Sequence, residues 1–248
     1  MENAKNGEDS VLIMPDVHGR DFWREGIKKR KPGELIIWLG DYTDPYPHEH
    51  ITHDKIPALL SELIETPNSI FLLGNHDLSY IYPKFSPAVR KDWDWDRKEW
   101  LGQFFEDHHD NFSLTHTLAR EDGNHVIFSH AGLLKDLYHR WNLKKYSPSQ
   151  AASLFNEWWE KRDPTLTTEL FKVGWKRGGC YKVGSLVWAD VREHIARRHY
   201  FWSHDYQVFG HTILKEGHII QFPCFACVDC QRPVRMWWNQ KKPVFEIL

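Results

Sequence analysis

The chain has 248 residues and a net charge of −2, with 32 Lys and Arg against 34 Asp and Glu. This length suits one α/β domain and allows a large core to form without disulfides. A hydrophobic content of 41% excludes a disordered chain, and the balanced charge gives no reason to expect a nucleic-acid partner. No stretch approaches the roughly 18 consecutive apolar residues of a transmembrane helix, so we expect no membrane partner.

Cysteine usage and the first residues of the chain bear on its location. Met1 to Ser10 is polar and acidic and lacks the apolar segment of a secretory signal. Four cysteines are too few for a disulfide-built scaffold of this length. We therefore expect a cytoplasmic protein. The 16 histidines are unusual and point to metal chemistry, because imidazole is a common ligand of transition metals.

Short apolar runs alternate with helical patterns in the first half of the chain, which is typical of a layered α/β fold. The sequence predicts strands at 11–14, 35–39 and 70–73, and helices at 20–30, 56–64 and 93–107. Two further runs, 111–118 and 125–128, flank Asp122-Gly123 and predict an antiparallel hairpin.

The second half begins with one more predicted helix. Ser147 suits its N-cap, with Pro148 at the first helical position and Gln150 completing a capping box. From residue 186 the predicted elements are mostly strands, at 186–188, 206–209, 218–222, 225–228, 234–238 and 244–247. No linker divides the chain, so we predict a single domain over 1–248, with a helical insertion at about 134–184.

Each of five predicted strands is followed directly by residues that bind metals. The five segments are Asp16-Val17-His18-Gly19, Gly40-Asp41-Tyr42-Thr43-Asp44, Gly74-Asn75-His76-Asp77, His130-Ala131-Gly132 and Gly210-His211-Thr212. In open α/β sheets, groups beyond the carboxyl ends of the strands converge on one crevice. Carboxylates, imidazoles and an amide oxygen suit Mn, Fe, Zn or Ni better than calcium. Each segment alone is weak evidence, but the five in order predict a metal centre.

These segments resemble the motifs of the calcineurin-like metallophosphoesterases. The matching stretches are PDVHG, GDYTD, GNHD, SHAG and FGHT, and the resemblance extends from about residue 11 to about residue 230. It implies a fold of two packed mixed β-sheets flanked by helices. It also implies a two-metal site at one edge of this sandwich.

The resemblance assigns a role to each residue that matches a motif. Asp16 and His18 would hold the first metal, Asp41 would bridge both metals, and Asn75, His130 and His211 would complete the second. The two ions would be divalent, with Mn expected first and Fe, Zn, Ni or Mg as alternatives. A hydroxide between them would attack phosphorus. His76 would be the general acid toward the leaving group, and Asp44 would orient it.

Two departures from the family pattern bear on branch and substrate. Many members carry a further His two residues after the one in FGHT, where this chain has Ile213. In this respect it resembles the serine/threonine phosphatase and diadenosine tetraphosphatase branch. That branch has an Arg directly after G-D-x-x-D, where this chain has Pro45. Arg192 and Arg177 are the candidates to bind phosphate in its place, unless they are ordinary surface arginines.

The sequence thus predicts a metal-dependent hydrolase of phosphate monoesters, acting on a small molecule or a phosphoprotein. Alternatives are a nucleotide pyrophosphohydrolase of the diadenosine tetraphosphatase type and a phosphodiesterase. An adaptor protein without metals is a third alternative, although His76 and Asp41 are intact.

The spacing Cys224-x-x-Cys227-x-x-Cys230 is compatible with a zinc or iron–sulfur site that includes Cys180. A strand there would place Cys227 and Cys230 on opposite faces, so we expect structural thiols instead.

Overall fold

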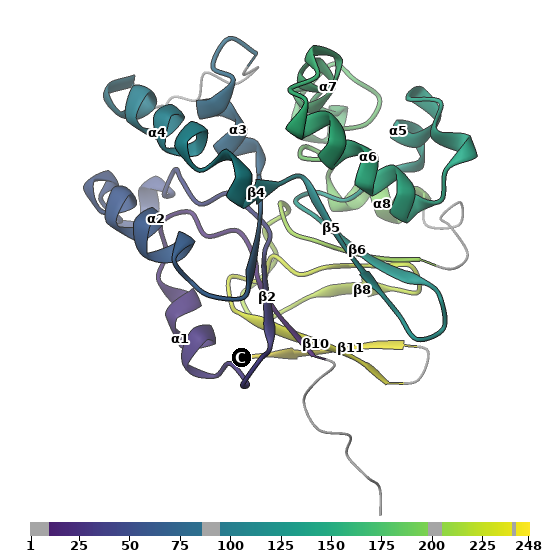
Figure 1. The fold of residues 1–248 in the computed structure, drawn as a ribbon, viewed down its shortest axis with the longest axis horizontal. Coiled ribbons are helices and arrows are strands. Elements are labelled where there is room, and N and C mark those ends of the chain that lie inside the picture. The colour runs from purple at the N-terminus through teal and green to yellow at the C-terminus, as the bar shows by residue number, and fades with distance from the viewer. Residues whose placement is uncertain (1–9, 86–94, 198–204, 240–241) are drawn as a thin grey trace, which may run out of the picture.

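The computed structural model describes residues 10–85, 95–197, 205–239 and 242–248 (Figure 1). Within this part of the chain, the strands form two mixed β-sheets that pack against each other, with helices on their outer sides. This is the fold class predicted from the sequence, and the prediction is confirmed.

The first sheet has six strands. In spatial order they are β11 (Lys242–Ile247), β10 (Val234–Asn239), β1 (Val11–Met14), β2 (Leu35–Trp38), β3 (Ser69–Leu72) and β4 (Phe112–Ser113). β1, β2, β3 and β4 are parallel, whereas β10 pairs with both β1 and β11 in antiparallel register.

The second sheet has five strands. In spatial order they are β5 (Thr115–Ala119), β6 (His125–Ser129), β7 (Tyr206–Phe209), β9 (Phe225–Cys227) and β8 (Ile220–Phe222). β6, β7 and β9 are parallel, and the outer strands β5 and β8 are antiparallel to their neighbours.

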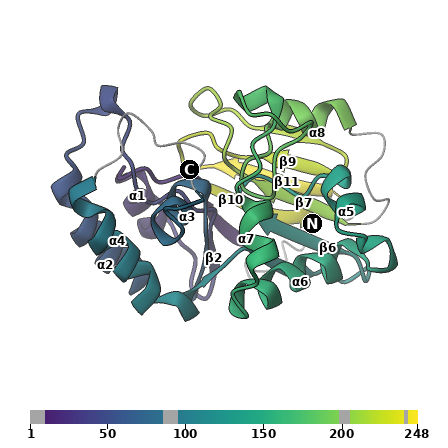
Figure 2. The same cartoon turned by 90° about the horizontal axis from the view of Figure 1, so that it is seen from above.

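Helices cover the outer faces of both sheets. They are α1 (Phe22–Lys28), α2 (Ile56–Ile64), α3 (Asn75–Ile81), α4 (Trp95–Asp107), α5 (Lys135–Arg140), α6 (Pro148–Glu160), α7 (Pro164–Leu170) and α8 (Val191–Arg197). Seen from above, α1 to α4 lie on one side of the molecule and α5 to α7 on the other (Figure 2). α5, α6 and α7 lie within 134–184, and that this segment is an insertion in a single domain stays a prediction.

Side-chain alternation along β1 connects the two parts of the core. Val11 and Ile13 face the second sheet, where they join Phe128 and Val208. Leu12 and Met14 point the other way, into the core beneath the helices. A strand buried on both faces is a continuous apolar run, because successive side chains point to opposite sides.

The capping box predicted for α6 is present. The Ser147 hydroxyl accepts a hydrogen bond from the Gln150 backbone N–H, and the Gln150 side chain accepts one from the Ser147 N–H. The two bonds satisfy backbone donors that the first helical turn leaves open.

Two predicted elements differ from the structure. The predicted strand 111–118 is two strands in different sheets, β4 and β5, which are separated at Leu114. The Asn156 side chain accepts hydrogen bonds from the N–H groups of Leu114 and Thr115 at this crossing.

The predicted strand 186–188 is wrong, because these residues form a turn in which the Ser185 carbonyl accepts hydrogen bonds from the N–H groups of Trp188 and Ala189.

The helix predicted at 93–107 corresponds to α4, and residues 93 and 94 lie outside the described residues. Helix α3 is not predicted by the sequence pattern.

Candidate metal centre

The loops that follow β1, β2, β3, β6 and β7 bring together all six residues expected to bind metal. Each is buried: Asp16, His18, Asp41, Asn75, His130 and His211. Five of them, all except Asn75, belong together with His76 to two groups in which the potential ligand atoms all lie within 4.8 Å of one another. One group contains Asp16, Asp41, His130 and His211, and the other contains His18, Asp41 and His76. Asp41 belongs to both, which is the arrangement expected of a bridging carboxylate.

The grouping differs in one respect from the ligand assignment that the resemblance implies. That assignment pairs Asp16 with His18 at the first metal. In the structure the ligand atoms of Asp16 lie with those of His130 and His211, whereas His18 lies with His76. The division of ligands between two ions therefore stays a prediction.

Backbone geometry makes this close approach possible. A Cβ atom on Gly74 would lie 2.0 Å from Asp41 Oδ1, and one on Gly210 would lie 2.4 Å from Asp16 Oδ1. Three cluster residues adopt left-handed backbone angles, with φ of 47° at His18, 52° at Asp41 and 65° at His211. Such conformations cost about 1–3 kcal/mol each outside glycine and concentrate at functional sites.

Hydrogen bonds to backbone carbonyls orient two of the histidines. His130 Nδ1 donates to the Leu39 carbonyl at 2.7 Å, which turns Nε2 toward Asn75 Oδ1 at 3.0 Å. His18 Nδ1 lies 3.1 Å from the Thr43 carbonyl. Its Nε2 lies 3.6 Å from Asp41 Oδ2 and is the group available to a metal.

Asp77 holds two of the ligand loops together. Its carboxylate accepts hydrogen bonds from the backbone N–H groups of Asp41, Tyr42 and Gly74 at 2.8, 3.0 and 2.9 Å. The loop after β2 is thereby fixed to the loop after β3, and Asp41 is placed beside Asn75. Sequence analysis did not assign this role to Asp77.

His76 and Asp44 lie together as the sequence predicts. His76 Nδ1 is 2.8 Å from Asp44 Oδ2, and the Tyr80 hydroxyl donates to the other oxygen of the same carboxylate. His76 Nε2 lies 3.9 Å from Asp41 Oδ2 and so faces the cluster. Tyr80 was not predicted, because it lies in the last turn of α3, a helix that the sequence pattern does not predict.

Burial and neighbouring charges shift the protonation of the cluster. Burial raises the pKa of Asp16 to about 6. Burial would also raise the pKa of Asp41, but His130 and His76 outweigh it and hold that pKa well below its usual value. Burial, together with His76, lowers the pKa of His18 to about 3, and burial with Arg177 lowers the pKa of His211. Asp41 and Asp16 outweigh burial at His130 and raise its pKa to about 10. Metals bind neutral imidazoles and ionised carboxylates, so a bound cation would displace the His130 proton.

A divalent cation fits these residues. The buried Nε2 atom of His211 has no hydrogen-bond partner among the described residues. Both carboxylate oxygens of Asp229 also lack a hydrogen-bond partner among the described residues. Asp229 is the second residue after β9. Buried polar groups normally have partners, and nitrogen and carboxylate oxygen donors of this kind suit Mn, Fe, Zn or Ni.

The sequence matches the calcineurin-like phosphoesterase family over residues 10–214. The chain belongs to this family. Membership indicates a metal-dependent phosphoric ester hydrolase, and the buried Asp and His cluster is the expected place for its metal. A search of the curated proteins returns no match.

Two solved structures are similar in fold to this family member. One is a point mutant of a cold-active protein tyrosine phosphatase, with 15% identity and a TM-score of 0.57, covering 97% of this chain and 78% of the other. The second is the cold-active protein-tyrosine phosphatase of a psychrophile, Shewanella sp., with 14% identity and a TM-score of 0.56, covering 96% and 80%. At these identities the similarity concerns the fold alone.

The two arginines predicted to bind phosphate have different surroundings. Arg177 Nη2 donates to the His211 carbonyl at 3.0 Å and to the Thr212 hydroxyl at 2.9 Å, so its guanidinium lies directly at the metal cluster. Arg192 donates through Nε and Nη2 to both oxygens of Asp190, and its side chain is 59% exposed. Of the two, Arg177 is better placed to meet a phosphate at the cluster.

The cysteines do not assemble in the way that a metal site requires. In the described ranges no group of potential metal ligands contains a cysteine, and all four thiols are free. The Cys227 thiol faces the Gly210 carbonyl, and burial raises the pKa of Cys230 to about 11. Both observations favour buried structural thiols.

Asp229 and Tyr46 are two further residues that sequence analysis did not place at the cluster. The Tyr46 hydroxyl lies 3.0 Å from His18 Nε2. Asp229 follows a buried strand, as the predicted ligands do, and this pattern was the available signal for it.

No helix in the described part of the chain is long and apolar enough to cross a membrane.

Proposed function

We propose that the protein is a binuclear metal-dependent phosphatase that hydrolyses phosphate monoesters. The observation that carries this proposal is the position of Asp41, which belongs to both groups of potential ligands. Bound divalent cations would stabilise the charge of a phosphoryl group and provide a water acidic enough to attack phosphorus.

His76 supplies the proton that the leaving group needs. Its Nδ1–H donates to Asp44, so Nε2 faces the cluster and carries the proton to be transferred when the ring is in its imidazolium form. A general acid placed in this way favours departure of a poor leaving group, because the leaving oxygen is protonated as its bond to phosphorus breaks.

Arg177 provides positive charge at the same place. A monoester carries two negative charges near neutral pH, and a guanidinium matches phosphate geometry. Arg177 and Arg192 both pair with Asp190, but only Arg177 also contacts His211 and Thr212, so Arg177 is the phosphate-binding residue in this proposal. The phosphatases of similar fold, named for protein tyrosine substrates, support a monoester substrate.

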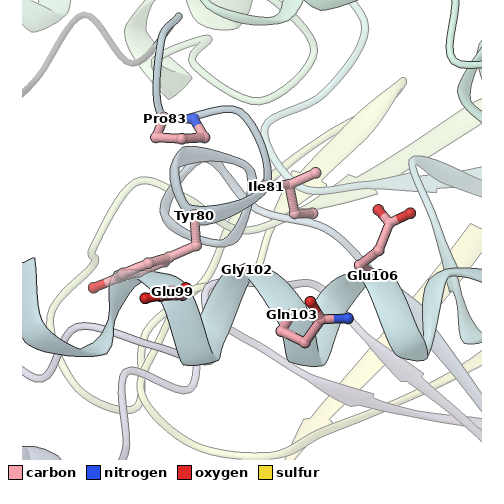
Figure 3. A pocket seen from close by; sticks show the side chains of 7 residues that line it. All are labelled: Tyr80, Ile81, Pro83, Glu99, Gly102, Gln103 and Glu106. Atoms are coloured by element: carbon pink, nitrogen blue, oxygen red, sulfur yellow. The ribbon is translucent and has the colours of Figure 1, made fainter.

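Phosphate would not bind in the cavity between α3 and α4. This cavity has a volume of about 550 Å³, with Tyr80 at one end and Glu106 at the other (Figure 3). Glu99 and Gln103 also line the cavity, and the carboxylates of Glu99 and Glu106 would repel an anion. The metal cluster is therefore the proposed site.

A nucleotide pyrophosphohydrolase is the second candidate, and one observation favours it. Trp175 is 65% exposed, and Tyr181 is 40% exposed, in the same loop as Arg177. The Trp175 N–H donates to the Tyr181 carbonyl, so the two aromatic residues lie together. Exposed aromatic rings beside a phosphate site suit a base, because base stacking needs only a flat apolar face.

One assay separates these candidates. The protein, stripped of metal with EDTA, is given Mn, Mg, Ni or Zn and then phenyl phosphate, a phosphodiester or diadenosine tetraphosphate. We expect metal-dependent hydrolysis that is fastest on the monoester. Predominant cleavage of the tetraphosphate, lost in Trp175→Ala, would favour the second candidate, and full activity in EDTA would refute both. We also propose a cytoplasmic location, on the cysteine usage.

A further inference from the structure

Asp229 is a buried carboxyl group without a partner. Its side chain is fully buried, and neither oxygen accepts a hydrogen bond from any described residue. Burying a carboxylate in this state is costly, so such groups persist where they serve a function. Glu34 is the contrasting case, because its buried carboxylate accepts hydrogen bonds from Ser10 and Arg235.

The backbone fixes Asp229 beside a ligand loop. The Val228 N–H donates to the Phe209 carbonyl, and the Leu214 N–H donates to the Asp229 carbonyl at 2.9 Å. Both partners flank His211, and β9 runs parallel to β7. Asp229 therefore lies at the same sheet edge as the residues that follow β1, β2, β6 and β7.

No cation of the described residues compensates Asp229. Arg20 is one of the charged groups that act on it, but the hydrogen bonds of Arg20 go to the carbonyls of Val17 and Asp16 and to Gln231. No described residue therefore provides a cation bonded to the Asp229 carboxylate.

We propose that Asp229 is a further carboxylate of the metal centre, a positioning residue for the divalent cation that Asp16 binds. The inference rests on the proposed function. Ile213 stands where many relatives have another histidine ligand, and its side chain is 46% exposed. The Asp229 carboxylate lies outside both groups of potential ligands, so it would act through water that the cation holds and supply negative charge on this side of the centre. A bound cation would then compensate the charge of the Asp229 carboxylate, which no described residue does.

The test compares cation affinity and stability in Asp229→Asn and in Glu34→Gln. Isothermal titration of the EDTA-stripped proteins with Mn²⁺ gives affinity, and thermal unfolding in EDTA gives stability. We expect Asp229→Asn to weaken Mn²⁺ binding about 10–100-fold, the range for groups that support metal ligands. We also expect it to melt no lower than the wild type without metal, because an unpartnered buried carboxyl is lost. Glu34→Gln should melt lower and bind Mn²⁺ as the wild type does.

Asp229→Ser is the second variant, because its smaller side chain leaves room for water and avoids crowding. Unchanged Mn²⁺ affinity in a folded variant of either kind would overturn the proposal while leaving the proposed function intact. A lower melting temperature in EDTA with unchanged affinity would show a structural role instead. A wild-type protein that binds no divalent cation would refute both the proposal and the proposed function.

Discussion

His76 and Asp44 are joined by a buried hydrogen bond, in which His76 Nδ1 lies 2.8 Å from Asp44 Oδ2. The carboxylate is itself held by the Tyr80 hydroxyl. The carboxylate fixes the tautomer of the ring, so that Nε2 faces the cluster. The pair is therefore oriented by the protein before substrate arrives, as an acid catalyst requires.

Replacing His76 should separate substrates by their leaving groups. In His76→Asn we expect turnover of an alkyl phosphate to fall about 10²–10⁴-fold, because the alkoxide must be protonated as it leaves. Turnover of p-nitrophenyl phosphate should fall much less, since nitrophenolate leaves without a proton. Steady-state kcat at saturating Mn²⁺ gives both numbers, and His116→Asn, on β5, is the control. Equal losses on the two esters would show that His76 is not the acid.

The strands that carry the cluster could be predicted because each is a short apolar run buried on both faces. β1, β2 and β7 begin at the predicted residues and end at or within one residue of the predicted ends. Apolar runs alone are ambiguous, as residues 186–188 show. Leu186 and Val187 are also buried, yet residues 186–188 form a turn. The Leu186 carbonyl accepts a hydrogen bond from the Ala131 N–H of a distant loop, which the local pattern does not reveal.

The same limit applies to the candidate site. The predicted ligands come together because each follows a strand directly, so strand order places them at one edge. The roles of Asp77 and Tyr80 depend on side-chain direction in α3, which the pattern of apolar residues does not reveal. Asp229 also follows a buried strand, but only the three-dimensional structure shows that its carboxylate lacks a hydrogen-bond partner.

The two arginines should differ in their effect on phosphate binding. Arg177→Ala should lower kcat/KM for phenyl phosphate about 10–100-fold and weaken inhibition by inorganic phosphate, because the charge at His211 is lost. Arg192→Ala is the matched control and should change kcat/KM by less than about fivefold, as for an exposed ion pair. Arg177→Lys should recover part of the loss. A larger effect at Arg192 would reverse the assignment.

Acid should destabilise the metal-free protein in part through His194. The ring stacks on Phe209 and its Nε2–H donates to the Ala131 carbonyl, and burial lowers its pKa to about 4. Because the folded pKa lies below the unfolded one, this stability is present above about pH 6.5 and is lost toward pH 4. His194→Gln keeps an N–H donor and should remove about 2 kcal/mol of the pH dependence between pH 7 and pH 4.5. Urea unfolding in EDTA at pH 7 and pH 4.5 measures it as a difference from the wild type, so contributions of His18 and Asp16 cancel. His218→Gln, at an exposed position, is the control. Parallel curves for wild type and His194→Gln would contradict the assignment.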